Sequence, residues 1–596
     1  MKKFHILFVR PTRYDQDGYP IHWTRSAMPS NTLAGLYGIA EDCHNRRILG
    51  EDVEIVMHPV DESNMRVDHD RMIAMMKQDA GGLLCLVGVQ TNQWPRATDM
   101  AQRYLAENIP VCIGGFHVAG CMNMLPELPP EIVEAQEQGI SIFAGEAEEE
   151  RLDEVLIDAY AGRLKPLYDH RKDMPGLEQS IVPFIPGKYV KRTHLQISSF
   201  DLGRGCPYEC SFCCIINVQG RKSRYRTPDD LERIIRRNQE EGVARFFLTD
   251  DNFARNRNWE PFLDRLIEIK DSLEIPLKFY IQVDTLCHKI PNFIEKCVQA
   301  GVDNVFIGLE NINPDNLAAM QKRQNKITEY RKMLLAWKKH PVVVSCGYII
   351  GFPNDTRESI LHDIELIKRE LPMDILNISI LTPIPGSQDH RDLYTRGEWM
   401  DPDLNKYDLT YRVTHHPKMS DDELDRTYQD AWDTYYTFDH MKTVLRRMAA
   451  LGSNKRVTTV DLLTYFGIIT KVHGLRSYDM GILRRACRLE RRRGMPIESP
   501  LVYYPRHWWR NLRAGLRIGL GYRKLYKAMQ EIWRDPARDD YMDRAIEPVQ
   551  DGDFEELSLF TETRGGQDAV AKHRKQKAIK EAARAPTETA KVDAAE

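Results

Sequence analysis

Three cysteines stand close together at Cys206, Cys210 and Cys213, in the order C-x3-C-x2-C, and Phe212 directly precedes the last of them. Three thiolates on one short loop can hold three corners of a cubane iron–sulfur cluster and leave the fourth iron without a protein ligand. An iron with a free coordination position can bind and reduce a substrate or cofactor, whereas a cluster with four cysteine ligands relays electrons. The spacing therefore predicts a [4Fe-4S] site with these three cysteines as ligands.

Other uses of closely spaced cysteines fit this sequence less well. A zinc site needs a second pair of Cys or His ligands at a short spacing, and none stands nearby. Disulfides are unexpected, because the N-terminus does not resemble a signal peptide and the remaining cysteines are scattered singly. Cys214 directly follows the motif, and we interpret it as a packed thiol because adjacent side chains point in divergent directions.

The composition is that of a large globular protein. The chain has 596 residues, of which 42% are hydrophobic and 29% charged, with a formal net charge of -4. No apolar run is long enough to cross a bilayer, and the charge balance argues against a general nucleic-acid binder. The 12 cysteines, without a secretory leader, fit a reducing compartment, so a cytoplasmic protein is expected.

Residues 1–165 alternate short apolar runs with helical stretches. Strands are expected at residues 4–9, 53–57, 83–89, 110–115 and 140–144. Such a βαβ series predicts a parallel, Rossmann-like sheet that gathers ligands at the carboxyl ends of its strands. Polar or glycine-rich turns follow the last three of these strands and favour a cofactor-binding edge; they contain Thr91, Gly114, Gly115, Phe116, Gly145 and Glu146.

The rest of the chain divides into four further parts. A Pro- and Gly-rich linker is expected over residues 166–195, and six strands alternate with helices over residues 196–410. This second series predicts a partial (β/α)6 barrel, with the cysteine loop after its first strand and chemistry at the carboxyl ends. Residues 411–550 have a helical pattern, and residues 551–596 have the polar composition of a disordered tail.

The later part of the helical region is both basic and aromatic, as in the segment 503–510. Arg and Lys interleaved with Trp and Tyr can lie at a membrane interface, so a peripheral membrane contact is one interpretation. The alternative is a solvated helix that packs its aromatic face on the barrel.

The cysteine loop is followed by polar or glycine-containing segments at the ends of the later strands, at residues 249–252, 308–310, 347–353 and 381–387. Taken in this order along the chain, these segments resemble the motifs of the core of radical S-adenosylmethionine (SAM) enzymes. In that family the open iron binds SAM, and reductive cleavage yields a radical that abstracts hydrogen from the substrate. The resemblance implies that Cys206, Cys210 and Cys213 bind iron and that Phe212 lies against the adenine. The further SAM contacts that it implies are Asp250, Asp251, Asn252, Glu310, Ile349, Gly351 and Thr382. The fifth-strand motif of the family commonly ends in Glu, whereas Asn354 stands here.

The N-terminal region is similar to the cobalamin-binding domain that precedes many such cores. This similarity implies cobalamin contacts at the strand-end residues Thr91, Gly114, Gly115, Phe116, Gly145 and Glu146. The D-x-H-x-x-G motif that supplies a lower axial histidine in other cobalamin proteins is absent, and residues 10–13 (Arg-Pro-Thr-Arg) stand after the first strand instead. Many members of the subfamily lack that histidine. His117 is interpreted as a turn residue.

Together the resemblances imply a cobalamin-dependent radical SAM enzyme that methylates an unactivated carbon of a small or lipid-like substrate. A flavodoxin- or ferredoxin-type protein would supply electrons. Mg-protoporphyrin cyclases share this architecture, so oxidation or cyclisation is an alternative, and hopanoid enzymes of the same architecture favour a lipid-like substrate. A methylthiotransferase would need Cys43, Cys85 and Cys112 to converge, which their expected places on one helix and two strands do not favour. An electron-transfer protein would need a fourth cysteine ligand.

Overall fold

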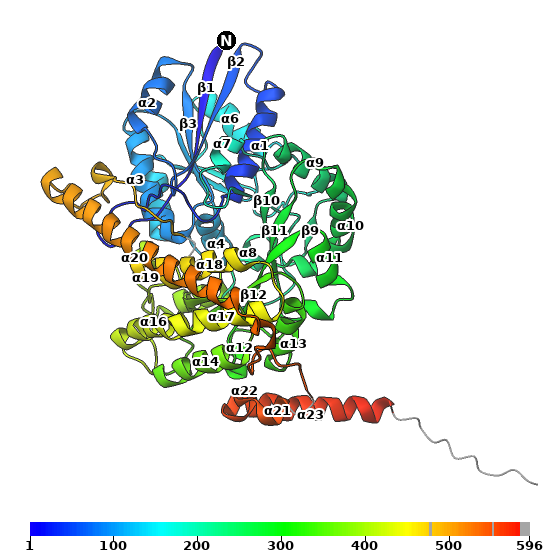
Figure 1. Ribbon diagram of the computed structural model, residues 1–596. Coiled ribbons are helices and arrows are strands. Elements are labelled where there is room, and N and C mark those ends of the chain that lie inside the picture. Colours follow the sequence, from blue (N-terminus) through cyan, green and yellow to red (C-terminus); the bar gives the residue numbers. More distant parts are fainter. Residues whose placement is uncertain (476–478, 551–552, 585–596) are drawn as a thin grey trace, which may run out of the picture.

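The computed structural model describes residues 1–475, 479–550 and 553–584, which form two parallel β-sheets and a helical C-terminal region (Figure 1). The first sheet has the order β2-β1-β3-β4-β5-β6, with every strand parallel to its neighbours. Its strands are β1 (Lys2–Arg10), β2 (Val53–Asp61), β3 (Gly82–Leu86), β4 (Val111–Gly114), β5 (Ser141–Ala144) and β6 (Leu167–Asp169). Helices cover both faces, which explains why these strands are near-continuous apolar runs.

The helices of this part are α1 (Asn31–Asn45), α2 (His69–Gln78), α3 (Trp94–Leu105), α4 (Phe116–Met124), α5 (Pro130–Glu137) and α6 (Arg151–Tyr160). Strand β6 lies inside the segment 166–195 that was expected to be a linker, where it pairs with β5 through Ile142 and Leu167. A three-residue edge strand gives no periodic signal, so the sequence pattern could not reveal it. The same segment also contains the short helix α7 (Gly187–Val190).

The second sheet carries the cysteine loop. It has the order β14-β13-β12-β11-β10-β7, again all parallel, and forms the expected partial (β/α)6 barrel. Its strands are β7 (Ile197–Phe200), β10 (Arg245–Leu248), β11 (Lys278–Val283), β12 (Val302–Glu310), β13 (Val343–Ile350) and β14 (Ile375–Ile380). A small antiparallel pair, β8 (Gly203–Arg204) and β9 (Arg224–Tyr225), flanks the loop.

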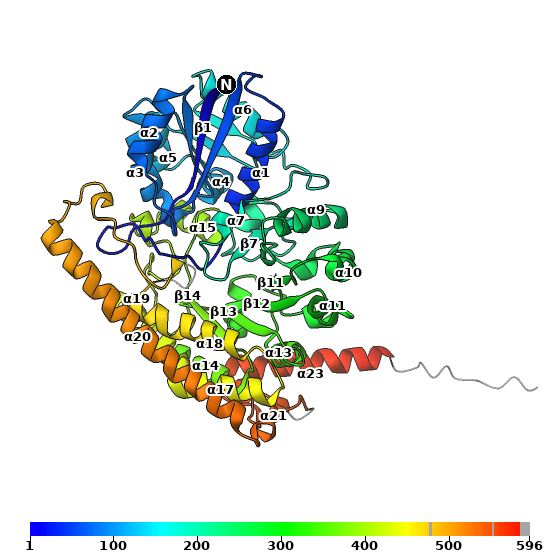
Figure 2. The same ribbon diagram turned by 45° about the horizontal axis from the view of Figure 1, so that its top comes forward.

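Helices line one side of this sheet, and Figure 2 shows α9, α10 and α11 stacked there. The helices of this part are α8 (Ile215–Val218), α9 (Pro228–Gln239), α10 (Trp259–Ile269), α11 (Phe293–Gln299), α12 (Pro314–Ala319), α13 (Ile327–Lys338), α14 (Arg357–Glu370) and α15 (Gln388–Arg396). Several begin with a side-chain cap; at α9, Thr227 and Asp230 form a capping box that satisfies the first free N–H groups.

The C-terminal region is helical as expected. Its helices are α16 (Asp421–Tyr435), α17 (Phe438–Ala450), α18 (Arg456–Thr464), α19 (Thr470–His473) and the long α20 (Pro500–Arg534), which lies along the outside of the molecule in both views. The expectation of a disordered tail from residue 551 is wrong for residues 553–584, which form α21 (Asp553–Glu556), α22 (Ser558–Thr561) and α23 (Arg564–Arg584).

The reason for this difference is a short apolar anchor in the tail. Leu557, Leu559 and Phe560 are buried in the main core, and Glu370 of α14 accepts hydrogen bonds from the backbone N–H groups of Ser558 and Leu559. Three apolar side chains in a polar segment are too few to change its composition, although they are enough to fix it in place. Residues 585–596 of the expected tail lie outside the described residues.

A buried ion cluster joins the two sheets. Glu146 and Glu148, just after β5, both pair with Arg204 of β8, at 2.5 Å and 2.6 Å. Arg204 also donates from Nε to Asp201 Oδ2 at 2.9 Å, and Arg224 of β9 donates to Glu146 Oε2 at 2.8 Å. The carboxyl end of the first sheet is therefore held against the segment that leads into the cysteine loop.

A second contact between the sheets is made by two glycines. Gly120 of α4 lies against the loop after β14, where an added Cβ would meet Pro385 O at 2.6 Å and Gly386 Cα at 2.9 Å. Asn217 of α8 donates to Gly386 O, and Asn123 of α4 donates to Asn217 O, both at 2.8 Å. Backbone thus touches backbone at this point, and only glycine fits.

We predict that Arg204→Gln destabilises the contact between the sheets. The substitution leaves the buried carboxylate of Glu148 without its partner and leaves Asp201 with only the longer 3.6 Å contact to Arg226, which costs about 3–5 kcal/mol. The matched control is Arg221→Gln, because Arg221 pairs with Glu209 in an exposed salt bridge worth less than about 1 kcal/mol. Urea denaturation and limited proteolysis measure the difference, and equal midpoints for the two variants would contradict the prediction.

We also predict that a chain ending at residue 550 is less stable than one ending at residue 584. The shorter chain loses the burial of Leu557, Leu559 and Phe560, worth about 3–6 kcal/mol in total. The longer chain keeps these contacts and should denature at the same temperature as the full-length protein. Identical melting temperatures for all three proteins would show that the anchor contributes no stability.

Candidate functional site

The three motif cysteines lie on the loop between β8 and α8, at the carboxyl end of the second sheet. Cys210 is buried, and Cys206 and Cys213 are half-buried. In the described part of the chain, the three sulfur atoms are not among the groups of ligand atoms that all lie within 4.8 Å of one another, the spacing that a single shared metal ion needs. The turn is held by backbone bonds from Cys206 N–H to Gly220 O and from Cys213 N–H to Cys210 O, both 3.2 Å.

A buried cation stands beside these sulfurs. Lys322 pairs with Glu310 at the end of β12 and lies 5.6 Å from the ring centre of Phe212. Burial alone would lower the pKa of Lys322, but Glu310 raises it, so the amine stays charged next to Cys210. Gln324 adds a weak hydrogen bond from Nε2 to Cys210 Sγ at 3.6 Å. Positive charge and N–H donors at this position stabilise thiolates and an anionic cluster.

Polar groups gather at the ends of β7 and β10, next to the loop. Asp250 accepts hydrogen bonds from the N–H of Leu202 at 2.7 Å and from Asn256 at 3.0 Å, so it supports the strand ends. Burial raises the pKa of Asp250 to about 6, and burial together with Asp250 raises the pKa of Asp251 to about 7. Asn252 donates to Asp284 at 2.9 Å.

Three buried oxygens at this edge have no hydrogen-bond partner among the described residues. They are Ser199 Oγ, Thr249 Oγ1 and Asn252 Oδ1. Unsatisfied buried polar atoms are costly, and their grouping at one strand edge is typical of a site for a polar ligand. The donor set therefore fits a molecule with amino and carboxylate groups, as SAM has.

The remaining predicted SAM residues lie along the ends of β12, β13 and β14. Glu310 has φ 63° at an irregular position of β12. Its carboxylate lies beside Gly308, and a Cβ added at Gly308 would be 2.3 Å from Glu310 Oε1. Ile349 is half-buried, and Thr382 is buried and donates to Ile380 O at 3.0 Å. Gly351 has φ 88°, which glycine adopts without strain.

The acidic residue of the fifth-strand turn is displaced by one position. Asn354 is exposed, and its carbonyl accepts a hydrogen bond from Lys418. The next residue, Asp355, is buried and accepts from the N–H groups of Gly351 and Phe352, both at 2.9 Å. Asp355 therefore closes the turn after β13, a role that the motif comparison did not assign.

The predicted cobalamin residues lie together at the carboxyl ends of β3, β4 and β5. Thr91 begins a short 3-10 turn, and its Oγ1 lies 3.2 Å from His117 Nδ1. Gly114 ends β4, and Phe116 begins α4. Gly115 and Gly145 have φ 150° and 130°, and an added Cβ would meet Val89 N at 2.2 Å and the His170 backbone at 2.9 Å. Both glycines are therefore already required by packing within the protein.

Glu146, for which a cobalamin contact is predicted, is paired with two arginines in this structure. Its carboxylate is occupied by Arg204 and Arg224, whose charges hold the pKa of Glu146 below its usual value despite the raising effect of burial. The sequence interpretation missed both arginines. The local sequence gives no signal for these pairs, because 57 residues separate Glu146 from Arg204.

Two positions were considered at the cobalt site, the segment after the first strand and His117, and His117 Nε2 has no hydrogen-bond partner among the described residues. Arg13, in the position after the first strand, is buried between Asp408 at 2.7 Å and Asp479 at 3.0 Å. His117 lies in the first turn of α4 rather than in a loop, and it is almost fully buried. Burial lowers its pKa to about 3, so the ring is neutral.

The cysteines that a second cluster would need are core residues. Cys43 lies on α1 and donates to Asp153 Oδ1 at 3.2 Å, while Cys85 and Cys112 are register partners on β3 and β4. All three belong to one apolar core cluster, yet they do not form a metal-binding group within the described part of the chain.

Comparison with known proteins agrees with this geometry. Residues 201–367 match the radical SAM superfamily. The bacteriochlorophyllide d C-12(1)-methyltransferase of Chlorobaculum tepidum is 28% identical over 327 residues, which cover 54% of this chain and 67% of that protein. The hopanoid C-2 methylase of Rhodopseudomonas palustris is 23% identical over 343 residues, which cover 56% of this chain and 62% of that protein.

The fold has a counterpart among solved structures. The cobalamin-dependent S-adenosylmethionine radical enzyme OxsB, with aqua-cobalamin bound, aligns over 96% of this chain and 84% of that chain, with a TM-score of 0.50 and 12% identity. The predicted fold class is thereby confirmed: a Rossmann-like sheet, a partial barrel and a helical C-terminal region. The segment 201–367, which contains the cysteine loop and most of the barrel strands, is thus the part of this chain that matches the radical SAM superfamily.

Proposed function

We propose that this protein is a cobalamin-dependent radical SAM methyltransferase that acts on an unactivated carbon of a small or lipid-like substrate. The observation that carries the proposal is the ion cluster of Glu146, Glu148 and Arg204, which holds the ligand-binding edge of the Rossmann-like sheet against the cysteine loop. Methyl transfer between two cofactors needs both to reach one substrate carbon, so their binding edges must face each other. The names of the two methylase relatives support the same reaction.

The residues of the barrel edge fit the expected cofactors. Cys206, Cys210 and Cys213 would hold the cluster, with Phe212, Asp251, Asn252 and Glu310 around SAM. When bound, the cluster and SAM would supply hydrogen-atom abstraction, and cobalamin would supply a methyl group. Lys322 pairs with Glu310 at the end of β12, and Asp284 accepts a hydrogen bond from Asn252. These residues bind and orient the cofactors in our proposal.

The strand-end residues of the first sheet would form the floor beneath cobalamin. Gly115 and Gly145 let the turns at this edge pack closely against Val89 and His170, and Asn92 Oδ1 is buried there without a hydrogen-bond partner among the described residues. Arg13, in the segment after β1, is paired with Asp408, and our proposal assigns cobalt no ligand from this protein. An external flavodoxin- or ferredoxin-type protein would reduce the cluster.

We predict that Cys206→Ala, Cys210→Ala and Cys213→Ala each abolish the cluster and SAM cleavage. Each variant removes one corner ligand, and a cluster held by two thiolates is lost in reconstitution. Cys214→Ala is the matched control, because Cys214 is an adjacent half-buried thiol that we do not assign to iron. Iron and sulfide analysis, with detection of 5′-deoxyadenosine, measures the outcome. Retention of SAM cleavage in a variant that carries all three substitutions would refute the assignment of these cysteines as cluster ligands.

A second prediction concerns the methyl group. Anaerobic protein reconstituted with cobalamin, and incubated with methyl-labelled SAM and an extract of membrane and soluble metabolites, should transfer the label to one product. An oxidase or cyclase of the same architecture would consume SAM without labelling a product, which separates the two reactions. Failure to take up any corrinoid, read from the optical spectrum of the desalted protein, would contradict the role given to the first sheet.

A further inference from the structure

Helix α20 exposes a long apolar stripe on the outside of the molecule. Its buried side packs through Tyr503, Ala514, Ile518 and Leu525, so the helix is firmly seated on the C-terminal region. The opposite side is apolar and open to solvent; Leu501, Val502, Tyr504, Trp508, Trp509, Leu512, Leu516 and Leu520 are between 41% and 85% exposed. We call these eight residues the α20 stripe, and at 1.5 Å per residue it extends for about 30 Å.

A pocket of arginines lies beside the stripe. Its volume is about 270 Å³, and its lining contains six arginines and a single carboxylate, that of Asp15. Four of the arginines come from α20 and two from the segment before it; they are Arg484, Arg485, Arg506, Arg510, Arg513 and Arg517. We call this the arginine pocket.

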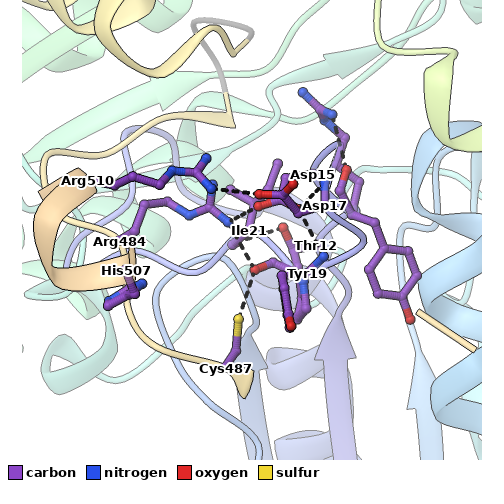
Figure 3. Close-up of polar contacts among 12 residues, drawn as sticks. Thr12, Asp15, Asp17, Tyr19, Ile21, Arg484, Cys487, His507 and Arg510 are labelled. Atoms are coloured by element: carbon purple, nitrogen blue, oxygen red, sulfur yellow. Dashed lines mark hydrogen bonds and ion pairs between the residues drawn. The ribbon is translucent and has the colours of Figure 1, made fainter. Parts of the chain in front are cut away.

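Half of these arginines are neutralised by neighbouring carboxylates. Figure 3 shows Arg484 and Arg510 directed at Asp15 and Asp17, with ion pairs of 2.8 Å and 2.7 Å. Arg506 pairs with Glu498 at 2.6 Å. These contacts hold three guanidinium groups in fixed positions around the pocket.

The other half have no acidic partner among the described residues. Among the described residues, no ion pair joins Arg485, Arg513 or Arg517 to a carboxylate. Burial, together with the nearby charge of Arg192, lowers the pKa of Arg485. Burial lowers the pKa values of the two histidines of the lining, His473 and His507, so both rings stay neutral and the positive charge of the pocket comes from its arginines. The pocket therefore carries uncompensated positive charge at a site large enough for a phosphate group.

The order of side chains around α20 places charge and apolar surface side by side. At 3.6 residues per turn, the arginines of the pocket fall between the buried face and the α20 stripe. A helix with Trp and Leu on one face and arginines along its border is typical of helices that lie in the plane of a membrane interface. Arginine can also keep its charged group at headgroup level while its methylene chain lies among apolar groups.

We propose that α20 docks this protein on a lipid bilayer containing anionic phospholipids, with the α20 stripe in the interface and a lipid phosphate in the arginine pocket. The positive charge of the arginine pocket favours an anionic surface over a neutral one. The α20 stripe is long and open to solvent, which suits contact with a planar surface. The searched part of the chain has no helix long and apolar enough to cross a membrane, so the contact is a peripheral one. The docking is independent of the methyl transfer proposed above.

The apolar half of the proposal is tested with Trp508→Ser/Leu512→Ser/Leu516→Ser. Sedimentation of the full-length protein with phosphatidylglycerol-containing vesicles should show that this variant binds roughly tenfold more weakly or worse. The matched control is Val133→Ser/Ile157→Ser/Ile275→Ser, which removes three exposed apolar side chains elsewhere, each 38% exposed. Exposed positions were chosen so that both proteins fold. Equal binding by the two variants would overturn the proposal.

The charged half is tested with Arg513→Gln/Arg517→Gln, two exposed arginines without acidic partners. Loss of these charges should weaken binding to anionic vesicles roughly tenfold or more and remove much of its salt dependence, while binding to phosphatidylcholine vesicles stays weak. The control Lys3→Gln/Lys172→Gln removes the same charge from two exposed sites, one on β1 and one in the turn after β6, and should bind normally.

Two further outcomes would replace the bilayer with another occupant. If inorganic phosphate, at the ionic strength of a chloride control, protects the pocket arginines from chemical modification while vesicles do not bind, the pocket is a site for free phosphate and the membrane proposal is wrong. If light scattering shows that the wild-type protein is a dimer and the Trp508→Ser/Leu512→Ser/Leu516→Ser variant is a monomer, and neither binds vesicles, the α20 stripe is an interface between two copies of this chain and the membrane proposal is wrong. A blue shift of tryptophan fluorescence with anionic vesicles alone supports the proposal.

Discussion

The arrangement of this molecule depends on one requirement, that charges removed from water be paired. Arg204, Asp201, Glu146 and Glu148 are largely shielded from solvent, and an unpaired charge at such a place costs several kcal/mol. The four groups can be satisfied together only if the end of β5 and the start of the cysteine loop meet. The electrostatic constraint therefore specifies the orientation of the two sheets, which hydrophobic contact alone would leave variable.

The C-terminal region applies the same physics at the other side of the first sheet. Arg96 of α3 pairs with Glu62 after β2 and, at 2.6 Å, with Glu490 of the segment that precedes α20. Arg13 likewise joins the loop after β1 to Asp408 and Asp479. Two buried arginines thus connect the N-terminal sheet to segments hundreds of residues away, so the helical region is part of the framework around the site.

The sequence was sufficient for features that local pattern determines. Apolar runs between helical stretches predicted the parallel strands of both sheets, and the spacing of Cys206, Cys210 and Cys213 placed the loop after β7. It was insufficient where a distant partner decides the outcome. Glu146 could not be recognised as a partner of Arg204, because 57 residues separate them and neither has a periodic pattern. The tail helices depend on Leu557, Leu559 and Phe560 finding a core made elsewhere in the chain, and β6 is fixed only by its pairing with β5.

Gly120 and Gly386 make the contact between the sheets as close as two backbones can come. The gap between the two cofactor-binding edges is thus set by two missing side chains, and a methyl group at either position would act as a spacer that pushes the edges apart. For a reaction that transfers one carbon from one edge to the other, such a displacement changes the distance over which the carbon must move. The distance between the two edges therefore depends on the absence of side chains at these two glycines.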